Sequence, residues 1–539
     1  MQPQLKNFTF TDNSVPVLQF THQGGTQQFS FKSNGPCFLT IPEEYKSWIS
    51  ISKVEHRGEE NVVEVTTAQY TGEGIHEGAI NVYCLDEEVE VPVLQYPYFA
   101  VFKDPFFERY ILEHFDTDKD GKISAEEAAT ITEINVIDYE DREKITSLEG
   151  IEFLPNLQSL ILSNDNWENR IPLYQLDVRK NKRLSVLNCA FCNLTQLDVS
   201  QNKALTKLVC WYNELTQLDV SKNANLTELR CSGNQLTQLD VSKNANLTEL
   251  WCSRNQLTQL DISRNTALTK LVCRYDQLTQ LDVSKNTALT ELECGKNQLT
   301  QLDVSKNTAL THLECEENQL THLDVSKNTA LTKLVCWYDQ LTQLDVSKNT
   351  ALTELECDYN QLTHLDVSKN KDLNSLYCDN NQLTHLDVSK NKDLNSLYCD
   401  NNQLTQLDVS QNTALTYLSC ENNQLTHLDV SQNTALTHLE CENNQLTHLD
   451  VSKNKDLNSL NCDNNQLTHL DVSKNKDLNW LYCEDNQLTH LDLTKNTKLK
   501  WLHINANPNL KFVYVRADFK DSIIKKDDTT KIIKADYMI

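Results

Sequence analysis

One pattern of 21 residues repeats from about Leu184 to Asn507, and it constrains the fold more than any other feature of the chain. A copy that begins at Leu205 reads LTKLVCWYNELTQLDVSKNAN. A fixed short period marks a solenoid, in which each coil buries its apolar face only against its neighbours. We therefore expect a long scaffold with a repeated surface, and not an enzyme with one pocket.

A cysteine takes the place of the last leucine of an LxxLxL pattern in fifteen consecutive copies. This place faces inward on a short strand, and buried free cysteine packs as a small hydrophobe. Because fifteen is odd and no CxxC pair has partner histidines, we expect reduced core thiols. The sequence leaves the state of Cys37 and Cys84 open. The ladder consists of Cys189, Cys210, Cys231, Cys252, Cys273, Cys294, Cys315, Cys336, Cys357, Cys378, Cys399, Cys420, Cys441, Cys462 and Cys483.

Each repeat contains two similar halves, LxxLxCxxN and LxxLxVxxN. Both halves place apolar residues with the alternation of a short strand, which predicts two short parallel strands per coil and two parallel sheets. About seventeen such coils give a mainly β solenoid. The two asparagines per coil are expected to hydrogen-bond the backbone of adjacent coils at the turns.

The repeat resembles the leucine-rich repeat family, in the nested-half class of bacterial surface proteins, and its cysteine ladder is similar to that of the internalins. The resemblance covers roughly 350 residues. It implies a solenoid fold and a role in adhesion at a cell surface.

Aromatic residues concentrate at outward places of the first half, while the second half hardly varies. Exposed Trp and Tyr anchor interfaces and stack on sugar rings, so this strip is the candidate binding surface. The alternative is cross-strand stacking that only stabilises the sheet. The strip comprises Trp211, Tyr212, Trp251, Tyr275, Trp337, Tyr338, Tyr359, Tyr377, Tyr398, Tyr417, Trp480 and Tyr482, with Trp501 in the last coil.

Charge along the strip is uneven. Lysines and arginines lie among its early coils, up to Lys333, and carboxylates follow from Glu354 to Glu484. The second half carries a row of aspartates and seven histidines that alternate with glutamines, for example His322 and His385. A row of metal sites is conceivable there, but solvated structural ladders are favoured.

A calcium loop is predicted by the segment DTDKDGKISAEE. It follows a helix that Asp104 and Pro105 should start, and a second helix is expected at about Ala125 to Glu133. Oxygen ligands, a glycine at the sharp turn and a final glutamate match a loop of the EF-hand kind, and the unit resembles a single EF-hand that closes the first coil. One structural Ca²⁺ ion is expected, with ligands from Asp116, Asp118, Asp120, Lys122, Ser124 and Glu127.

Strand-like runs up to about Pro97 predict a small antiparallel sandwich. GGTQQFSF, Trp48 in SWISIS and the final VPVLQ resemble the BACON domain of exported Bacteroidetes proteins, which implies carbohydrate or mucin binding; a spacer is equally compatible. The expected domains are a sandwich at 1–97, a helical cap at 98–143, the repeats at 144–511 and a C-terminal cap at 512–539.

A net charge of −27 argues against nucleic acid as a partner. No run approaches the ~20 apolar residues of a membrane helix, and no catalytic motif is present. We expect a monomeric, non-enzymatic binding or adhesion protein that recognises a protein, glycoprotein or glycan. Its expected location is extracellular or on the outer membrane after removal of a signal peptide, although a cytosolic protein fits the same N-terminus. The alternative function is a passive spacer or surface-layer scaffold.

Overall fold

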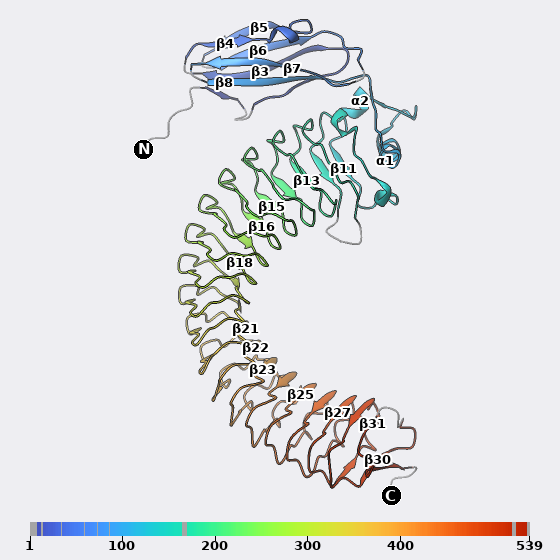
Figure 1. Cartoon of the computed structure of the whole chain (residues 1–539), viewed down its shortest axis with the longest axis vertical. Coiled ribbons are helices and arrows are strands. Elements are labelled where there is room, and N and C mark those ends of the chain that lie inside the picture. Colours follow the sequence, from blue (N-terminus) through green and yellow to red (C-terminus); the bar gives the residue numbers. More distant parts are fainter. Residues whose placement is uncertain are drawn as a thin grey trace. The chain divides into compact units, whose positions relative to one another are not determined.

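The computed structural model describes residues 8–11, 15–33, 35–58, 60–72, 74–85, 87–163, 170–519 and 524–535. The chain forms two compact units, Met1–Leu247 and Thr248–Ile539 (Figure 1). The fold is a mainly β solenoid with few helices and a β-rich N-terminal region, as the repeat predicts.

The N-terminal region is a sandwich of two four-stranded sheets. Their facing sides bury one apolar cluster that includes Phe31, Val63, Ile80 and Val91. All pairs are antiparallel except β2 with β8. One sheet has the order β1 (Phe8–Phe10), β3 (Gly25–Ser33), β6 (Glu60–Thr67) and β5 (Ile49–Arg57), and the other has β2 (Leu18–Phe20), β8 (Glu87–Gln95), β7 (His76–Cys84) and β4 (Cys37–Thr40).

Cys37 and Cys84 form a disulfide between β4 and β7. The two residues are directly opposite in the antiparallel pairing, and their Cα atoms are 4.3 Å apart. The sequence leaves the state of these two cysteines open, and the structure shows them oxidised to a disulfide.

A short helical segment joins the sandwich to the first coil. Its helix α1 (Pro105–Phe115) begins as predicted, because the Asp104 carboxylate accepts the N–H groups of Phe106 at 2.9 Å and Phe107 at 3.0 Å. The expected extent of the second helix is wrong, since α2 ends at Ala128. The chain that follows instead forms β11 (Glu133–Asn135), which buries Ile134 and pairs with β12 (Ser159–Ile161) at the start of a parallel sheet. The remaining elements of this segment are β9 (Phe99–Ala100), β10 (Ile123–Ser124), η2 (Arg142–Lys144) and η3 (Ile151–Phe153), while η1 (Glu43–Tyr45) lies in the sandwich between β4 and β5.

The first half of each repeat contributes one three-residue strand to this parallel sheet, with equivalent residues in register. In the second unit the strands lie along the inner side of the curved array (Figure 1). The first unit contains β13 (Val186–Asn188), β14 (Lys207–Val209) and β15 (Glu228–Arg230). The second contains β16 (Glu249–Trp251), β17 (Lys270–Val272), β18 (Glu291–Glu293), β19 (His312–Glu314), β20 (Lys333–Val335), β21 (Glu354–Glu356), β22 (Ser375–Tyr377), β23 (Ser396–Tyr398), β24 (Tyr417–Ser419), β25 (His438–Glu440), β26 (Ser459–Asn461), β27 (Trp480–Tyr482), β29 (Trp501–His503) and β31 (Ile524–Lys525).

The predicted second sheet along the other side of the repeats is wrong. Among the described residues, the second halves of the repeats form β-pairs at only two places. One is an isolated bridge between Asp177 and Asp198. The other is strand β28 (His490–Asp492), which pairs with β30 (Phe512–Arg516), and β30 pairs in turn with β32 (Lys531–Ala535). On this side of the repeats, hydrogen bonds within the turns take the place of hydrogen bonds between strands. The Val283 carbonyl, for example, accepts both the N–H of Asn286 and the side-chain amide of Asn307, each at 3.0 Å.

The core consists of rows of identical side chains. In the coil that begins at Leu310, the side chains of Leu310, Leu313, Cys315, Leu320 and Val325 are all fully buried. The cysteine ladder is free and buried, as predicted, and burial raises the pKa of thiols such as that of Cys315 well above the usual value. These thiols therefore stay neutral and serve as core packing.

Two rows of buried asparagines connect each coil to the preceding one, as the sequence predicts. In the first-half row, Asn318 accepts the N–H of Leu299 at 2.9 Å and donates to the carbonyls of Cys294 at 3.2 Å and Cys315 at 2.9 Å. In the second-half row, Asn307 donates to the carbonyls of Val283 at 3.0 Å and Asn286 at 2.8 Å. Side-chain amides thus satisfy backbone groups that the turns would otherwise bury without partners.

Aspartate replaces asparagine twice in the first-half row. Asp339 keeps the bond from the N–H of Leu320 at 2.9 Å, but its second carboxyl oxygen has no partner among the described residues. Asp276 has the same arrangement toward Leu257. Burial raises the pKa of each carboxyl to about 7.

We predict that Asp339→Asn stabilises the protein, because an amide can donate to the carbonyls that a carboxylate repels. A carboxyl with a raised pKa costs stability progressively from its unfolded pKa, near 3.8, up to about 7, and the cost is constant above that. The gain should therefore be larger at about pH 8 than at about pH 5, on the order of 1–3 kcal/mol at the higher pH. Thermal unfolding at both pH values measures it. Asn318→Asp is the matched control and should lower stability; an equal gain at both pH values would contradict the explanation.

Candidate binding face

The outward residues of the repeat strands, with the two residues after each ladder cysteine, form a continuous series that we call the strand face. The middle leucine of each three-residue strand, such as Leu376, is fully buried, and its neighbours Ser375 and Tyr377 lie on the outward side, where they are half-buried. Past the cysteine the chain turns, and the second residue has a left-handed backbone in nearly every coil. The strand face carries all the aromatic residues that the sequence places on the candidate strip.

Four tyrosines of the strip lie at this left-handed turn, which is strained for a bulky side chain. Tyr212, Tyr275, Tyr338 and Tyr359 have φ values of 50°, 58°, 56° and 48°. They are exposed, at 46%, 37%, 52% and 46%, and the other exposed ring of the strip is that of Trp501 in the last coil, at 48%. Later coils place asparagine here, which tolerates this conformation better. Those asparagines are Asn380, Asn401, Asn422, Asn443 and Asn464.

Eight rings of the strip are half-buried, and three of them stack on one another. Tyr398 lies between Tyr377 and Tyr417, with ring centroids 4.5 and 4.6 Å apart, and Tyr417 stacks on His438 at 5.4 Å. For these rings the alternative interpretation, cross-strand stacking that stabilises the sheet, describes the geometry well. The half-buried members are Trp211, Trp251, Trp337, Tyr377, Tyr398, Tyr417, Trp480 and Tyr482.

Cations cover several of the rings in the early coils. In the first unit, the Arg230 guanidinium lies 5.6 Å from the centroid of Trp211. In the second, Arg254 lies 4.0 Å from the ring of Tyr275, and Lys270 lies 4.7 Å from that of Trp251. Such cation–π contacts hold the rings in place and leave polar groups beside them.

A buried ion-pair network on the strand face was missed from the sequence. Arg274 reaches across two coils to Glu316, which is fully buried, and also lies 3.0 Å from Glu314 and 3.6 Å from Glu293. Gly295 makes room for it, since a Cβ there would lie within 2.4 Å of the Glu316 carboxylate. The one available signal was this glycine at an outward place of the repeat.

The later coils lack such neutralisation. Lysine and arginine are absent from the corresponding outward places between Lys333 and the end of the repeats. Burial, followed by repulsion from neighbouring carboxylates, raises the pKa of Asp379 and of Glu421 to about 8. Asp379 accepts the N–H of Asp400 in the next coil at 2.7 Å, whereas Glu421 accepts from the side-chain amide of Asn461 at 3.1 Å. Lysines pair only with the two ends of this stretch, Lys333 with Glu354 at 3.4 Å and Lys525 with Glu484 at 3.0 Å, and between them the acids are crowded in a way that a cation would relieve.

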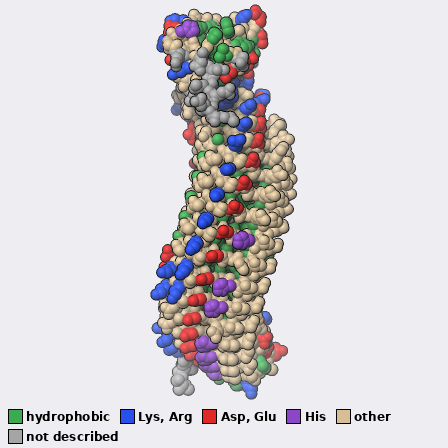
Figure 2. All heavy atoms as spheres, turned by 90° about the vertical axis from the view of Figure 1, so that its left-hand side faces the viewer, with side chains coloured by type: hydrophobic (Ala, Val, Ile, Leu, Met, Phe, Trp, Pro, Cys, Tyr) green, Lys and Arg blue, Asp and Glu red, His purple; other side chains and the backbone are tan. Residues whose placement is uncertain are grey.

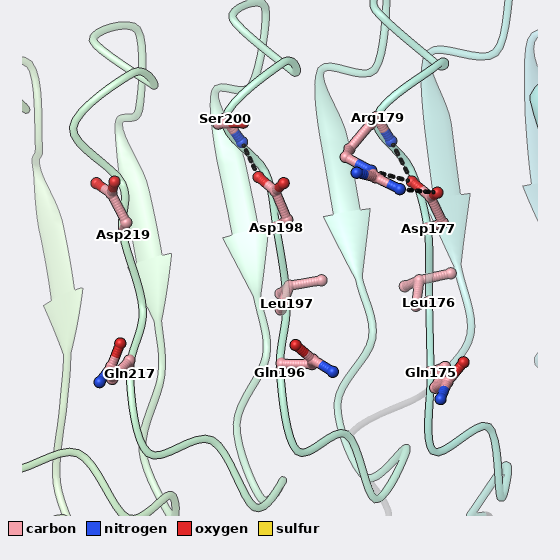
Figure 3. A pocket seen from close by; sticks show the side chains of 10 residues that line it. All are labelled: Gln175, Leu176, Asp177, Arg179, Gln196, Leu197, Asp198, Ser200, Gln217 and Asp219. Atoms are coloured by element: carbon pink, nitrogen blue, oxygen red, sulfur yellow. Dashed lines mark hydrogen bonds and ion pairs between the residues drawn. The ribbon is translucent and has the colours of Figure 1, made fainter.

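The opposite side of the repeats is built from constant polar rows, which we call the second-half face. Figure 3 shows its arrangement in the first unit, where Gln196 and Asp198 recur one coil on as Gln217 and Asp219 and line a shallow groove of about 710 Å³. Each aspartate accepts the N–H two residues on, as Asp198 does from Ser200 at 2.9 Å. Figure 2 shows these acidic residues as a row, with lysines on one side and histidines in later coils on the other.

The structure brings three of the predicted calcium ligands together. Single carboxylate oxygens of Asp116, Asp118 and Asp120 lie within 4.8 Å of one another. Gly121, with φ 81°, makes the turn and donates its N–H to Asp116 at 2.9 Å. The loop is therefore shaped around these carboxylates.

Glu127 holds the ends of the same loop together. One of its oxygens accepts from the Thr117 N–H at 2.8 Å and the other from the Ser124 N–H at 3.0 Å. Burial alone would raise the pKa of Glu127, but the hydrogen bonds from Thr117 and Ser124 outweigh it and hold the pKa at about 2. The Lys122 side chain lies over Phe99 at 4.6 Å, so Lys122 can offer only its backbone carbonyl.

Known proteins share the repeat and the fold. The family described as Leucine Rich repeats (2 copies) matches residues 224–265. The functional domain of InlJ from Listeria monocytogenes, which includes a cysteine ladder, is 38% identical, with a TM-score of 0.53; the match covers 63% of this chain and 70% of that one.

Two further comparisons add less. The PEPR1–AtPEP1 crystal structure has a TM-score of 0.55 and covers 68% of this chain and 63% of its own, but at 17% identity it shows the fold alone. No curated protein matches the chain significantly. On its repeat, its core and its likeness to the cysteine-ladder domain, the chain belongs to the leucine-rich repeat proteins.

Proposed function

We propose that the protein is a non-enzymatic binding or adhesion protein that recognises a protein, glycoprotein or glycan through the strand face. The observation that carries this proposal is the exposed tyrosine at the left-handed turn. Residues in strained conformations persist where function uses them. Tyrosine there costs roughly 1–2 kcal/mol, although asparagine serves the same turn in later coils. Tyr338 and Tyr359, stacked at 4.3 Å, are the strongest candidates for direct contact.

The uneven charge of the strand face supports a partner with basic groups at one end. Burial first, and then repulsion from neighbouring carboxylates, raises the pKa of acids in this stretch, as it does for Glu421 to about 8. A partner that places lysine or arginine over them relieves the repulsion. The earlier coils, where Arg274 and its neighbours are already paired, supply aromatic contact instead.

A cell-surface or secreted location is supported by the Cys37–Cys84 disulfide, since structural disulfides persist in oxidising compartments. The ladder cysteines are compatible with that setting because all of them are buried. None of the helices that the structure describes is long and apolar enough to span a bilayer.

For the N-terminal sandwich we propose a spacer role. Trp48, which carries the BACON-like resemblance, is 8% exposed and packs against His76 with ring centroids 3.9 Å apart. A ring covered in this way cannot stack on a sugar.

We also propose that the loop at 116–127 binds one structural Ca²⁺ ion. The carboxylates of Asp116, Asp118 and Asp120, the Lys122 carbonyl, Ser124 and Glu127 would hold it. The donor set is all oxygen, as Ca²⁺ prefers, and the convergence of three aspartates on one point is costly without a cation. The ion would hold α1 and β11 together at the first coil, where Tyr110 already donates to the Asn135 carbonyl at 2.8 Å.

The double variant Tyr338→Asn/Tyr359→Asn tests the binding face. Asparagine is what later coils use, so melting temperature should stay equal or rise while binding to an immobilised mucin or glycan array falls about tenfold or more. Surface plasmon resonance and thermal unfolding measure the two effects. The matched variant Tyr377→Asn/Tyr398→Asn removes half-buried stacked rings and should lower the melting temperature. Full binding by the first variant, or no binding by the unaltered protein to any probe, would favour the passive scaffold.

Removal of calcium should lower the melting temperature of the full chain. A ligand at 100 times its Kd stabilises by about 2.7 kcal/mol, so a chelator should shift unfolding of the N-terminal unit by several degrees. Asp118→Asn should abolish the shift, whereas Asp138→Asn, outside the loop, should keep it. Identical melting with calcium and with chelator would refute the site.

A further inference from the structure

The second-half face contains a row of histidines that neither the fold nor the strand face uses. They occur at one repeat place, which glutamine fills in the other coils. All of them are exposed, and Figure 2 shows them along the acidic row. The row consists of His322, His364, His385, His427, His448, His469 and His490.

The histidines are grouped along the solenoid. His322 stands alone, because its neighbours one coil away are Gln301 and Gln343. His364 and His385 form a pair on consecutive coils. The last four occupy consecutive coils, from His427 to His490. The chain therefore contains both an isolated imidazole and adjacent imidazoles at the same place of nearly identical repeats.

Adjacent rings lie at a distance suited to a shared ion. The ring centroids of His469 and His490 are 5.1 Å apart. Zinc bonds imidazole nitrogen at about 2.0–2.1 Å, and two imidazoles in tetrahedral coordination then have centroids roughly 5 Å apart. Thr489 Oγ1 lies 3.3 Å from Nδ1 of His490, which leaves Nε2 as the nitrogen available to an ion. A hydrogen bond at the other ring nitrogen is typical of metal-bound histidine.

Carboxylates beside the histidines favour a cation at this place. Asp471 and Asp492 follow the two histidines by two residues on the same extended segments, with the buried Leu470 and Leu491 between. Asp471 accepts the Ser473 N–H at 2.9 Å, which fixes the position of its carboxyl group. Asp492 accepts from the N–H of Thr494 at 2.9 Å. A row of fixed negative charge raises the local concentration of cations.

We propose that His469 and His490 together bind a divalent transition-metal ion of the zinc, nickel or copper class. Imidazole suits these ions, and water or a neighbouring carboxylate completes the coordination. The pairs His364–His385 and His427–His448 share only the sequence spacing of one repeat with this pair. The proposal is independent of the binding face, because it concerns the opposite side of the repeats.

Titration of the full chain with ZnCl₂ by isothermal calorimetry tests the proposal. Excess CaCl₂ should be present, so that the loop at 116–127 is filled. The double variant His469→Gln/His490→Gln should lose one equivalent of bound zinc and keep its melting temperature in zinc-free buffer, because glutamine is native to this place. His322→Gln removes an isolated histidine and should leave the titration unchanged.

Three results would overturn the assignment. One is the absence of saturable zinc binding by the unaltered chain. Another is an unchanged zinc stoichiometry in the double variant. The third is an equal loss in His322→Gln, which would show that single exposed imidazoles, and not adjacent pairs, account for the binding.

Discussion

The hydrogen bonds of the two asparagine rows are the interaction on which the rest of the structure depends. A coil with one three-residue strand has too few ladder bonds to satisfy its own backbone. Asn318 and Asn307 show how the side-chain amides complete it, each bonding backbone groups of its own coil or the preceding one. Because these bonds lie in the core, they do not depend on which side chains stand at the outward places. The repeat can therefore vary on one face without loss of the fold.

The two faces of the repeats differ in how much their outward residues vary. The strand face varies from coil to coil, and it holds strained exposed tyrosines, a buried network around Arg274 and a stretch of crowded carboxylates. The second-half face repeats the same polar rows, with histidine and glutamine as its main variation. Variation of shape and charge is what recognition of a particular partner needs, whereas a constant row suits a small ligand that can bind at several equivalent places.

Much of the fold could be predicted from the sequence, because one period repeats the same evidence many times. The inward cysteines and the turn asparagines follow directly from it. The second sheet could not be predicted correctly, since LDVS has a strand-like pattern and only the structure shows that Asn286 and Asn307 already occupy the Val283 carbonyl. The second helix was expected to run to about Glu133, and strand β11 was not expected, because its pairing with β12 depends on a distant segment. The Arg274–Glu316 ion pair spans two coils, and no pattern in the sequence around either residue predicts it. For the candidate site, the sequence located the aromatic strip but could not separate the exposed tyrosines from the half-buried ones, because both kinds occupy outward places.

The central claim is that a partner covers the exposed tyrosines of the strand face. Oxidative footprinting of the full chain, free and bound to a mucin or glycoprotein ligand, tests it most directly, because it reads the exposure of individual side chains. We predict protection of Tyr338 and Tyr359 in the complex, with His364 and His385 on the opposite face oxidised at unchanged rates. Protection confined to the histidine side, or no change at either tyrosine, would contradict the account.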